Sequence, residues 1–144
     1  MKLRVAITGS SGYLAQQLIA RLGSDPDCEY ILGLDVRRRV LQVGCEAEFF
    51  QFDMTLPYEM LVEFLQKRAI NTGLHLAWQF NPIHDLKRHR EVDVNGSMNF
   101  FRAAFAAGLK HDLFDEDFAR SYELNQSISV DWMDFLADTA LEDL

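Results

Sequence analysis

The chain has 144 residues, of which 49% are hydrophobic and 25% charged, and its formal net charge is −8. This composition is that of one ordinary globular domain and excludes fibrous and disordered chains. No stretch reaches the ~18 apolar residues of a membrane span, and residues 1–7 lack the long apolar region and cleavage site of a signal peptide. The two cysteines form no disulfide framework, so we expect a cytoplasmic protein.

The negative charge is concentrated near the C-terminus. Residues 1–111 carry 13 Lys and Arg against 12 Asp and Glu, a net of +1, whereas residues 112–144 carry one Arg and ten acidic residues, a net of −9. Such a shift indicates a domain boundary. We therefore expect a folded domain over 1–111 and an acidic tail over 112–144. The acidic total also argues against nucleic acid as a partner.

Strand and helix patterns alternate along the first 111 residues. Apolar segments predict strands at 3–7, 30–34, 48–52 and 74–78, and apolar residues at helical spacing predict helices over 14–23, 57–65 and 94–109. A fifth strand near 111–115 is expected to be very short or absent, because only two of its residues are apolar. The apolar face of the last helix is predicted to consist of Val94, Met98, Phe101, Phe105 and Leu109.

This alternation implies βαβ units with right-handed crossovers and a parallel sheet. The first strand, glycine turn and helix have the order of a doubly wound dinucleotide-binding fold. We therefore predict an α/β protein, a truncated doubly wound (Rossmann-like) parallel sheet with an acidic helical C-terminal tail.

The tail is predicted to be helical and packed. Of its 33 residues 16 are apolar, too many for a solvated acidic segment. It would either cover an exposed edge of the sheet or place an apolar face in the groove of a partner protein. Self-association is a further expectation, because a short sheet leaves apolar surface to cover. Residues at helical spacing in the tail are Phe114, Phe118 and Tyr122, followed by Trp132, Leu136 and Ala140.

The glycine turn is the most informative segment. In Thr8–Ala15 the first glycine permits the tight turn, the second lets the backbone approach a pyrophosphate, and Ala15 is the small third residue. Asp35 follows Ala15 by 20 residues, at the end of the second predicted strand, where a carboxylate binds an adenosine ribose. The alternative is a structural turn without phosphate. The residues expected around the pyrophosphate are Gly9, Ser11, Gly12, Tyr13 and Leu14.

At these residues the chain resembles the N-terminal half of an extended short-chain dehydrogenase/reductase of the NAD-dependent epimerase/dehydratase family. Thr8–Ala15 resembles the family's T-G-x-x-G-x-x-G/A, and His75–Ala77 resembles its fourth-strand H-L-A-A, although Trp78 replaces the last small residue. Val94–Gly96 resembles the V-N-x-x-G segment that opens the next helix. The resemblance covers about residues 1–110.

The resemblance also implies positions for the rest of a dinucleotide. Asp53 and Met54 would contact the adenine, and Leu76 and Ala77 would lie on the path to the nicotinamide. Asp35 favours NAD, because a carboxylate repels the 2′-phosphate of NADP. NADP stays possible, since Arg37 or the two arginines that follow it could pair with a phosphate or stack on the adenine.

The family's catalytic residues have no counterpart here. The resemblance implies a Ser or Thr and a Y-x-x-x-K pair, in which the lysine lowers the pKa of the tyrosine. None of the four lysines follows a tyrosine by four residues, and the residue four after Tyr122 is Gln126. We predict no catalytic residue, and no metal site either, because the histidines and cysteines lack ligand spacing.

Three functions follow as alternatives. The chain is an NAD(P)-binding module without catalysis of its own, half of an oxidoreductase or epimerase that a partner chain completes, or a degenerate Rossmann fragment that acts as an interaction module. The third includes a truncated gene product, because the resemblance ends near Lys110. The helical periodicity of the tail argues against an arbitrary reading frame.

Overall fold

The computed structural model describes residues 2–77, 87 and 91–114. Five strands form one parallel sheet in the order β3-β2-β1-β4-β5, which is the order of a doubly wound fold. The predicted fold class is therefore confirmed, and residues 115–144 of the predicted tail lie outside the described residues. Along the chain the elements are β1 (Leu3–Thr8), α1 (Tyr13–Gly23), β2 (Cys28–Asp35), β3 (Glu46–Gln51), α2 (Tyr58–Lys67), β4 (Thr72–His75), the π-helical turn η1 (Glu91–Asn95), α4 (Gly96–Ala107) and β5 (His111–Phe114).

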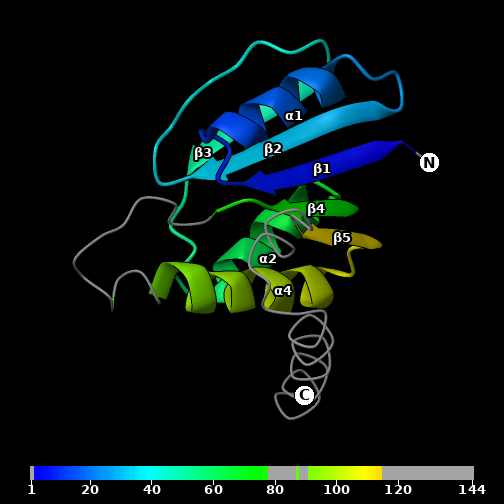
Figure 1. Ribbon diagram of the computed structural model, residues 1–144. Helices are drawn as coiled ribbons and strands as arrows, with labels where there is room; N and C mark the ends of the chain where they lie inside the picture. Colours follow the sequence, from blue (N-terminus) through cyan, green and yellow to red (C-terminus); the bar gives the residue numbers. More distant parts are fainter. Residues whose placement is uncertain (1, 78–86, 88–90, 115–144) are drawn as a thin grey trace.

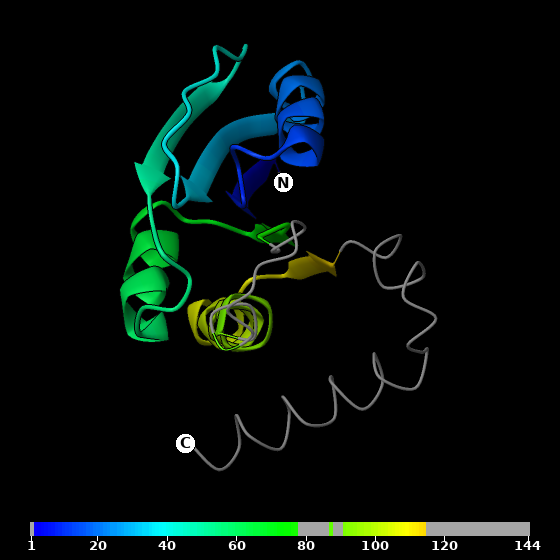
Figure 2. The same cartoon turned by 60° about the vertical axis from the view of Figure 1, so that its left-hand side comes forward.

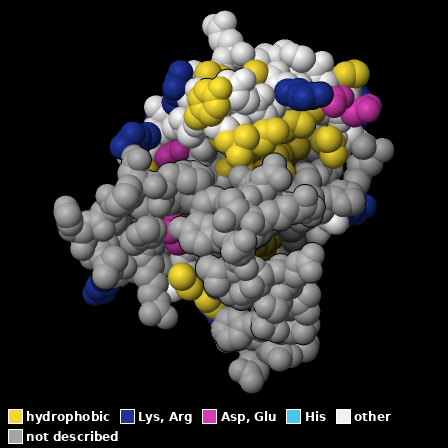
Figure 3. All heavy atoms as spheres, viewed as in Figure 1, with side chains coloured by type: hydrophobic (Ala, Val, Ile, Leu, Met, Phe, Trp, Pro, Cys, Tyr) yellow, Lys and Arg dark blue, Asp and Glu magenta, His cyan; other side chains and the backbone are white. Residues whose placement is uncertain are grey.

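The helices lie on both faces of the sheet. Helix α1 covers one face, and α2 and α4 lie side by side on the other (Figures 1 and 2). Strand β2 is buried from both sides, because Leu32 and Leu34 pack towards α2 and α4 while Ile31 packs towards α1. This double burial explains why residues 30–34 of β2 form a nearly continuous apolar run. On the face seen in Figure 3, hydrophobic side chains gather along α1.

The fifth strand is present. Strand β5 has four residues and pairs in parallel with β4 from Thr72 opposite His111 to His75 opposite Phe114, so of the two expectations the very short strand is confirmed and the missing strand is not. The backbone hydrogen bonds of β4 hold it in the sheet despite its polar sequence, because pairing depends on the partner strand as well as on apolar side chains. Strand β5 also crosses the boundary predicted after residue 111.

The buried face of α4 differs from the predicted one. Phe100, Ala103 and Ala104 are fully buried, whereas Phe105 is 64% exposed. The small alanines let α4 approach its neighbours closely. Of the predicted face, Phe101 and Leu109 are partly buried and pack against the core, whereas Phe105 does not. The helix ends at Gly108 in the left-handed conformation, whose N–H donates to the Phe105 carbonyl at 3.0 Å. No helix in the described ranges is long and apolar enough to cross a membrane.

Candidate dinucleotide site

The glycine turn lies at the carboxyl end of β1, in contact with the end of β4. Gly9 has a φ of +66°, and a Cβ there would lie 2.6 Å from the Leu76 carbonyl oxygen and 2.9 Å from the Cα of Ala77. Both the conformation and the contact therefore require glycine. The turn thus brings Gly9, Leu76 and Ala77 together, as the predicted site requires. The carboxyl edge of such a sheet is where doubly wound proteins bind ligands.

The predicted acid is fixed beside this turn. The carboxylate of Asp35 accepts the N–H of Ser11 at 2.9 Å and the N–H of Arg37 at 3.0 Å. The Ser11 hydroxyl donates to the Arg37 carbonyl at 2.6 Å. A carboxylate has about four acceptor positions, so these backbone contacts use two of them. Asp35 is half-buried, and it remains able to accept further hydrogen bonds.

Helix α1 begins directly at the turn. Gly12 is its N-cap in extended conformation (φ −71°, ψ 159°), and its N–H donates to the Gly9 carbonyl at 3.0 Å. The next amides lie in the first turn of the helix, where N–H groups lack intrahelical acceptors and favour anions. Tyr13 and Leu14 are 82% and 44% exposed, and Ala15 is buried against the sheet. The exposed start of α1 leaves these amides within reach of a ligand.

A buried series of hydrogen bonds between polar side chains holds the segment after β4 in place. His75, at the end of β4, is fully buried and stacks on Phe100 with ring centroids 4.9 Å apart. Its Nδ1 lies 2.8 Å from Thr8 Oγ1, and its Nε2 lies 2.9 Å from Ser97 Oγ. Thr8 Oγ1 in turn accepts the N–H groups of Leu76 at 3.1 Å and Ala77 at 3.3 Å.

The directions of these hydrogen bonds fix the state of the histidine. The Ser97 hydroxyl donates to the Asp93 carbonyl, so Nε2 of His75 must carry the proton that Ser97 accepts. Nδ1 then accepts from the Thr8 hydroxyl, and the ring is neutral. Burial lowers the pKa of His75 to about 3, so the ring stays neutral throughout the physiological range. His75 is therefore a positioning residue for residues 76 and 77, without charge of its own.

The predicted adenine contacts lie beside the end of β2. The Phe52 N–H donates to the Asp35 carbonyl at 2.8 Å, which places Asp53 next to that acid. One carboxylate oxygen of Asp53 accepts both the N–H of Thr55 at 2.9 Å and its hydroxyl at 2.7 Å. The side chain of Met54 does not lie at the surface: it is 6% exposed and packs in the core towards α2 and α4.

Three residues join the site that the sequence did not single out as contacts. Thr8 and Ser97 form the polar chain through His75, and Gln16 closes the glycine turn through a bond from its Nε2 to the Ser11 carbonyl at 3.0 Å. Thr8 belongs to the glycine motif, so the sequence offered a signal for it. Ser97 had none, because it lies 22 residues from its histidine. Within the described ranges, no group of His, Cys, Asp and Glu could hold a metal ion.

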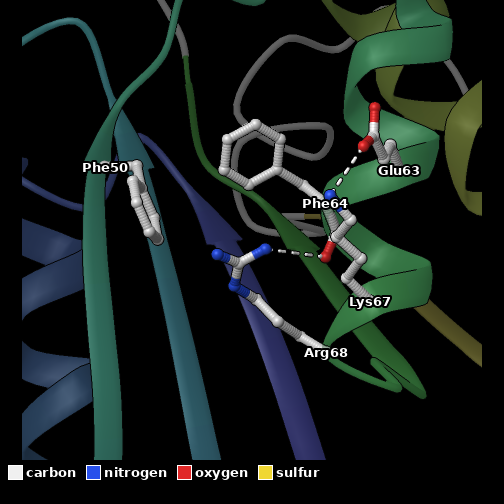
Figure 4. A pocket seen from close by; sticks show the side chains of 5 residues that line it. All are labelled: Phe50, Glu63, Phe64, Lys67 and Arg68. Carbon is white, nitrogen blue, oxygen red and sulfur yellow. Dashed lines mark hydrogen bonds and ion pairs between the residues drawn. The ribbon is translucent and has the colours of Figure 1, made fainter.

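A separate pocket lies between β3 and α2 (Figure 4). It measures about 200 Å³, and none of its lining residues belongs to the predicted cofactor site. The guanidinium of Arg68 lies 4.8 Å from the ring centre of Phe50 and 4.9 Å from that of Phe64. Arg68 also donates to Glu48 at 3.3 Å. The pocket is lined by Phe50, Glu63, Phe64, Lys67 and Arg68.

Known proteins were compared with this chain by sequence and by structure. No family profile matches the sequence, and no curated protein does. The enzyme WbmG of Bordetella bronchiseptica, solved with NAD and UDP, matches with a TM-score of 0.70 and 25% identity over 79% of this chain and 37% of its own. The UDP-glucose-4-epimerase of Stenotrophomonas maltophila, solved with NAD and formylated UDP-arabinopyranose, matches with a TM-score of 0.63 and 19% identity over 78% of this chain and 36% of its own.

A short-chain dehydrogenase/reductase superfamily protein of Agrobacterium tumefaciens, solved with NAD, matches with a TM-score of 0.62 and 23% identity over 77% of this chain and 31% of its own. This chain has the fold of part of a short-chain dehydrogenase/reductase. The resemblance predicted from the motifs is thus confirmed at the level of the fold. The match covers between 31% and 37% of the length of these three proteins.

Proposed function

We propose that this chain binds NAD across the carboxyl ends of β1, β2 and β4. The pyrophosphate would lie against the turn from Gly9 to Gly12 and the first amides of α1, at Tyr13 and Leu14. The dipole of α1 and its free N–H groups favour an anion there. The exposed start of the helix and the close approach of the turn to β4 support this assignment.

The observation that carries the proposal is the position of Asp35. Its carboxylate is bound by the turn itself through the Ser11 N–H, so the ribose acceptor and the phosphate cradle form one unit. Both of its donors are neutral backbone amides, and its negative charge is therefore not cancelled by a cation in contact. A ribose 2′-hydroxyl would donate to an acceptor position that remains, whereas a 2′-phosphate would be repelled.

The remaining predicted residues would frame the ends of the cofactor. Arg37 is exposed beside Asp35 and would lie near the adenosine, with Asp53 and the backbone of Met54 on the adenine side. Leu76 and Ala77 would line the path to the nicotinamide, held by Thr8 and His75. When bound, NAD supplies a ring that accepts or donates hydride.

Titration calorimetry with NAD and NADP tests this function. We expect binding of NAD, weaker binding of NADP, and roughly tenfold or greater weakening of NAD binding in Asp35→Asn, because a charge-assisted hydrogen bond is lost. Asp27→Asn removes an exposed carboxylate in the turn before β2 and is the matched control, with unchanged affinity. Equal binding by both Asn variants would contradict the role of Asp35, and no binding of either nucleotide would overturn the proposal.

We further propose that residues 1–144 do not catalyse a reaction by themselves. The support is the lack of a Y-x-x-x-K pair in this sequence and a match that covers only 37% of WbmG and 36% of the epimerase. An oxidoreductase or epimerase step would then need the catalytic groups of a partner chain. Failure to bind NAD would instead favour the interaction module, in which the acidic tail contacts a partner protein or a second copy.

A further inference from the structure

The chain contains two cysteines, and the fold brings them together. Cys28 is the first residue of β2, and Cys45 immediately precedes β3. Both side chains belong to the cluster under α1, Cys28 at 4% exposure and Cys45 half-buried. Both thiols are free in the structure. Seventeen positions apart in the sequence, they lie at the same end of two paired strands and on the same face of the sheet.

Strand register gives their separation. Tyr30 pairs with Glu46, so Cys45 comes just before the first paired residue of β3. A bulge at Glu29, where the pairing with β1 passes from Cys28 directly to Tyr30, turns Cys28 to the same face as Ile31 and Cys45. One strand spacing of ~4.8 Å and one residue rise of ~3.3 Å place the two Cα atoms roughly 6 Å apart. Disulfides have Cα separations of about 4.4–6.8 Å. The backbone therefore already has the geometry of a cross-strand disulfide.

The two thiols lie close enough for the ionisation of one to affect the other. Burial raises the pKa of Cys28 to about 11, and the next cause is the neighbouring Cys45, through charge repulsion and a side-chain hydrogen bond. The Cys28 thiol donates to the Tyr30 carbonyl, 3.9 Å from its sulfur, a weak hydrogen bond that a bond to Cys45 would replace. Both side chains pack in the same apolar cluster under α1.

The segment between the cysteines is anchored close to them. A Cβ on Gly23, at the end of α1, would lie 2.5 Å from Val43 Cβ, and a Cβ on Gly44 would lie 2.7 Å from the Gly23 carbonyl oxygen. These close contacts hold residues 43 and 44 against α1, directly before Cys45. The same segment includes Asp35 and Arg37, which we assign to the nucleotide. A bond between the cysteines would therefore close a loop that contains one end of the candidate site.

We propose that Cys28 and Cys45 form a reversible intramolecular disulfide that staples the segment between β2 and β3. A low-molecular-weight disulfide such as oxidised glutathione is the oxidant. The Cys45 thiolate, the more exposed of the two, attacks one sulfur of the oxidant and releases one reduced thiol. The Cys28 thiolate then attacks the mixed disulfide at the Cys45 sulfur and releases the second. Both cysteines are oxidised, the oxidant is reduced to two thiols, and no other reactant is needed.

Intact-mass measurement of the full 144-residue chain after treatment with oxidised glutathione tests this site. We expect a monomer that has lost two hydrogen atoms, carries no glutathione and yields one peptide linking residues 28 and 45. Reduction with dithiothreitol restores both thiols. The melting temperature of the oxidised chain should exceed that of the reduced chain by roughly 10 °C, since the bond closes a loop of about 18 residues.

Cys45→Ser is the matched variant, because Cys45 is half-buried and its replacement leaves the core cysteine in place. It should retain one thiol and show no rise in melting temperature after oxidation. A stable glutathione adduct on wild-type Cys45, a disulfide-linked dimer, two unreacted thiols, or a lower melting temperature of the oxidised chain would each overturn the proposal. None of these readouts depends on NAD.

Discussion

Two carboxylates of neighbouring strands, Asp35 of β2 and Glu48 of β3, are held in different ways. Asp35 accepts two backbone N–H groups, from Ser11 and Arg37. Glu48 accepts side-chain donors, the Tyr30 hydroxyl at 2.6 Å and the Arg68 guanidinium at 3.3 Å. The hydrogen bond from Tyr30, followed by the bond and charge of Arg68, lowers the pKa of Glu48.

The difference separates a site that can recognise a ligand from a structural network. Neutral amides orient Asp35 without cancelling its charge, so the carboxylate still attracts a hydroxyl donor. Glu48 is paired with the cation of Arg68, which lines the pocket of Figure 4. The region around Gly9 and Asp35 should therefore respond to changes in backbone geometry, and the region around Glu48 to the loss of single side chains.

The largest expected effect comes from Gly9→Ala. The alanine would have to keep the left-handed backbone conformation of Gly9, and its Cβ would lie 2.6 Å from the Leu76 carbonyl oxygen. That oxygen belongs to the backbone and cannot move away as a flexible side chain could. Strain and overpacking together predict a loss of roughly 2–5 kcal/mol in the free energy of unfolding. NAD binding should be lost with it. Urea unfolding and calorimetry provide the two measurements.

Gly108→Ala is the matched control for this variant. Gly108 has a similar φ of +73°, but a Cβ there meets nothing within 4 Å. Only the conformational strain applies, about 1 kcal/mol, and NAD affinity should not change. Equal losses of stability in the two variants would show that the contact between the turn and β4 contributes nothing.

The burial of His75 in the same region should make the free energy of unfolding depend on pH. Unfolded His75 binds a proton below about pH 6.5, whereas in the folded chain burial lowers its pKa to about 3. The unfolded state thus binds more protons between these values, and stability falls as pH falls through this window. From pH 7 to pH 5 the loss is roughly 2 kcal/mol.

His75→Gln removes this contribution. The variant is less stable at pH 7, because the polar chain to Thr8 and Ser97 is broken, but its stability should vary less between pH 7 and pH 5. Urea unfolding at several pH values measures both slopes. Restricting the range to above pH 5 avoids the titration of most carboxylates. Parallel slopes for wild type and variant would contradict a neutral, buried His75.

Local sequence patterns predicted what local chemistry determines. The turn at Gly9 and Gly12 was found from the motif, because its conformation and its contact with β4 admit only glycine at the first position. The strands were found from apolar runs, with bounds shifted by up to two or three residues, since Thr72 and Gly73 of β4 are buried although neither is a large apolar residue.

Long-range contacts were beyond these patterns. Strand β5 depends on pairing with β4, 39 positions earlier in the chain, and the exposed Phe105 depends on which side of α4 meets the sheet and α2. The chain from Thr8 through His75 to Ser97 joins three segments, and no local spacing reveals it. Sequence patterns thus indicated the glycine turn and the strand ends of the candidate site better than the buried residues that hold them in place.

The smallest effect is expected from Tyr30→Phe, which tests the structural role of the second carboxylate. Tyr30 is 2% exposed, and the variant keeps its ring in the core while removing the hydroxyl that Glu48 accepts. Loss of one such hydrogen bond costs about 1 kcal/mol, and less if water reaches the half-buried Glu48. The pKa of Glu48 should rise towards its ordinary value, because its main stabilising bond is gone. NAD affinity should stay unchanged, since none of the atoms involved contacts Asp35 or the turn. A drop in affinity as large as that of Asp35→Asn would show that the two carboxylates belong to one coupled network, and the distinction between them would fail.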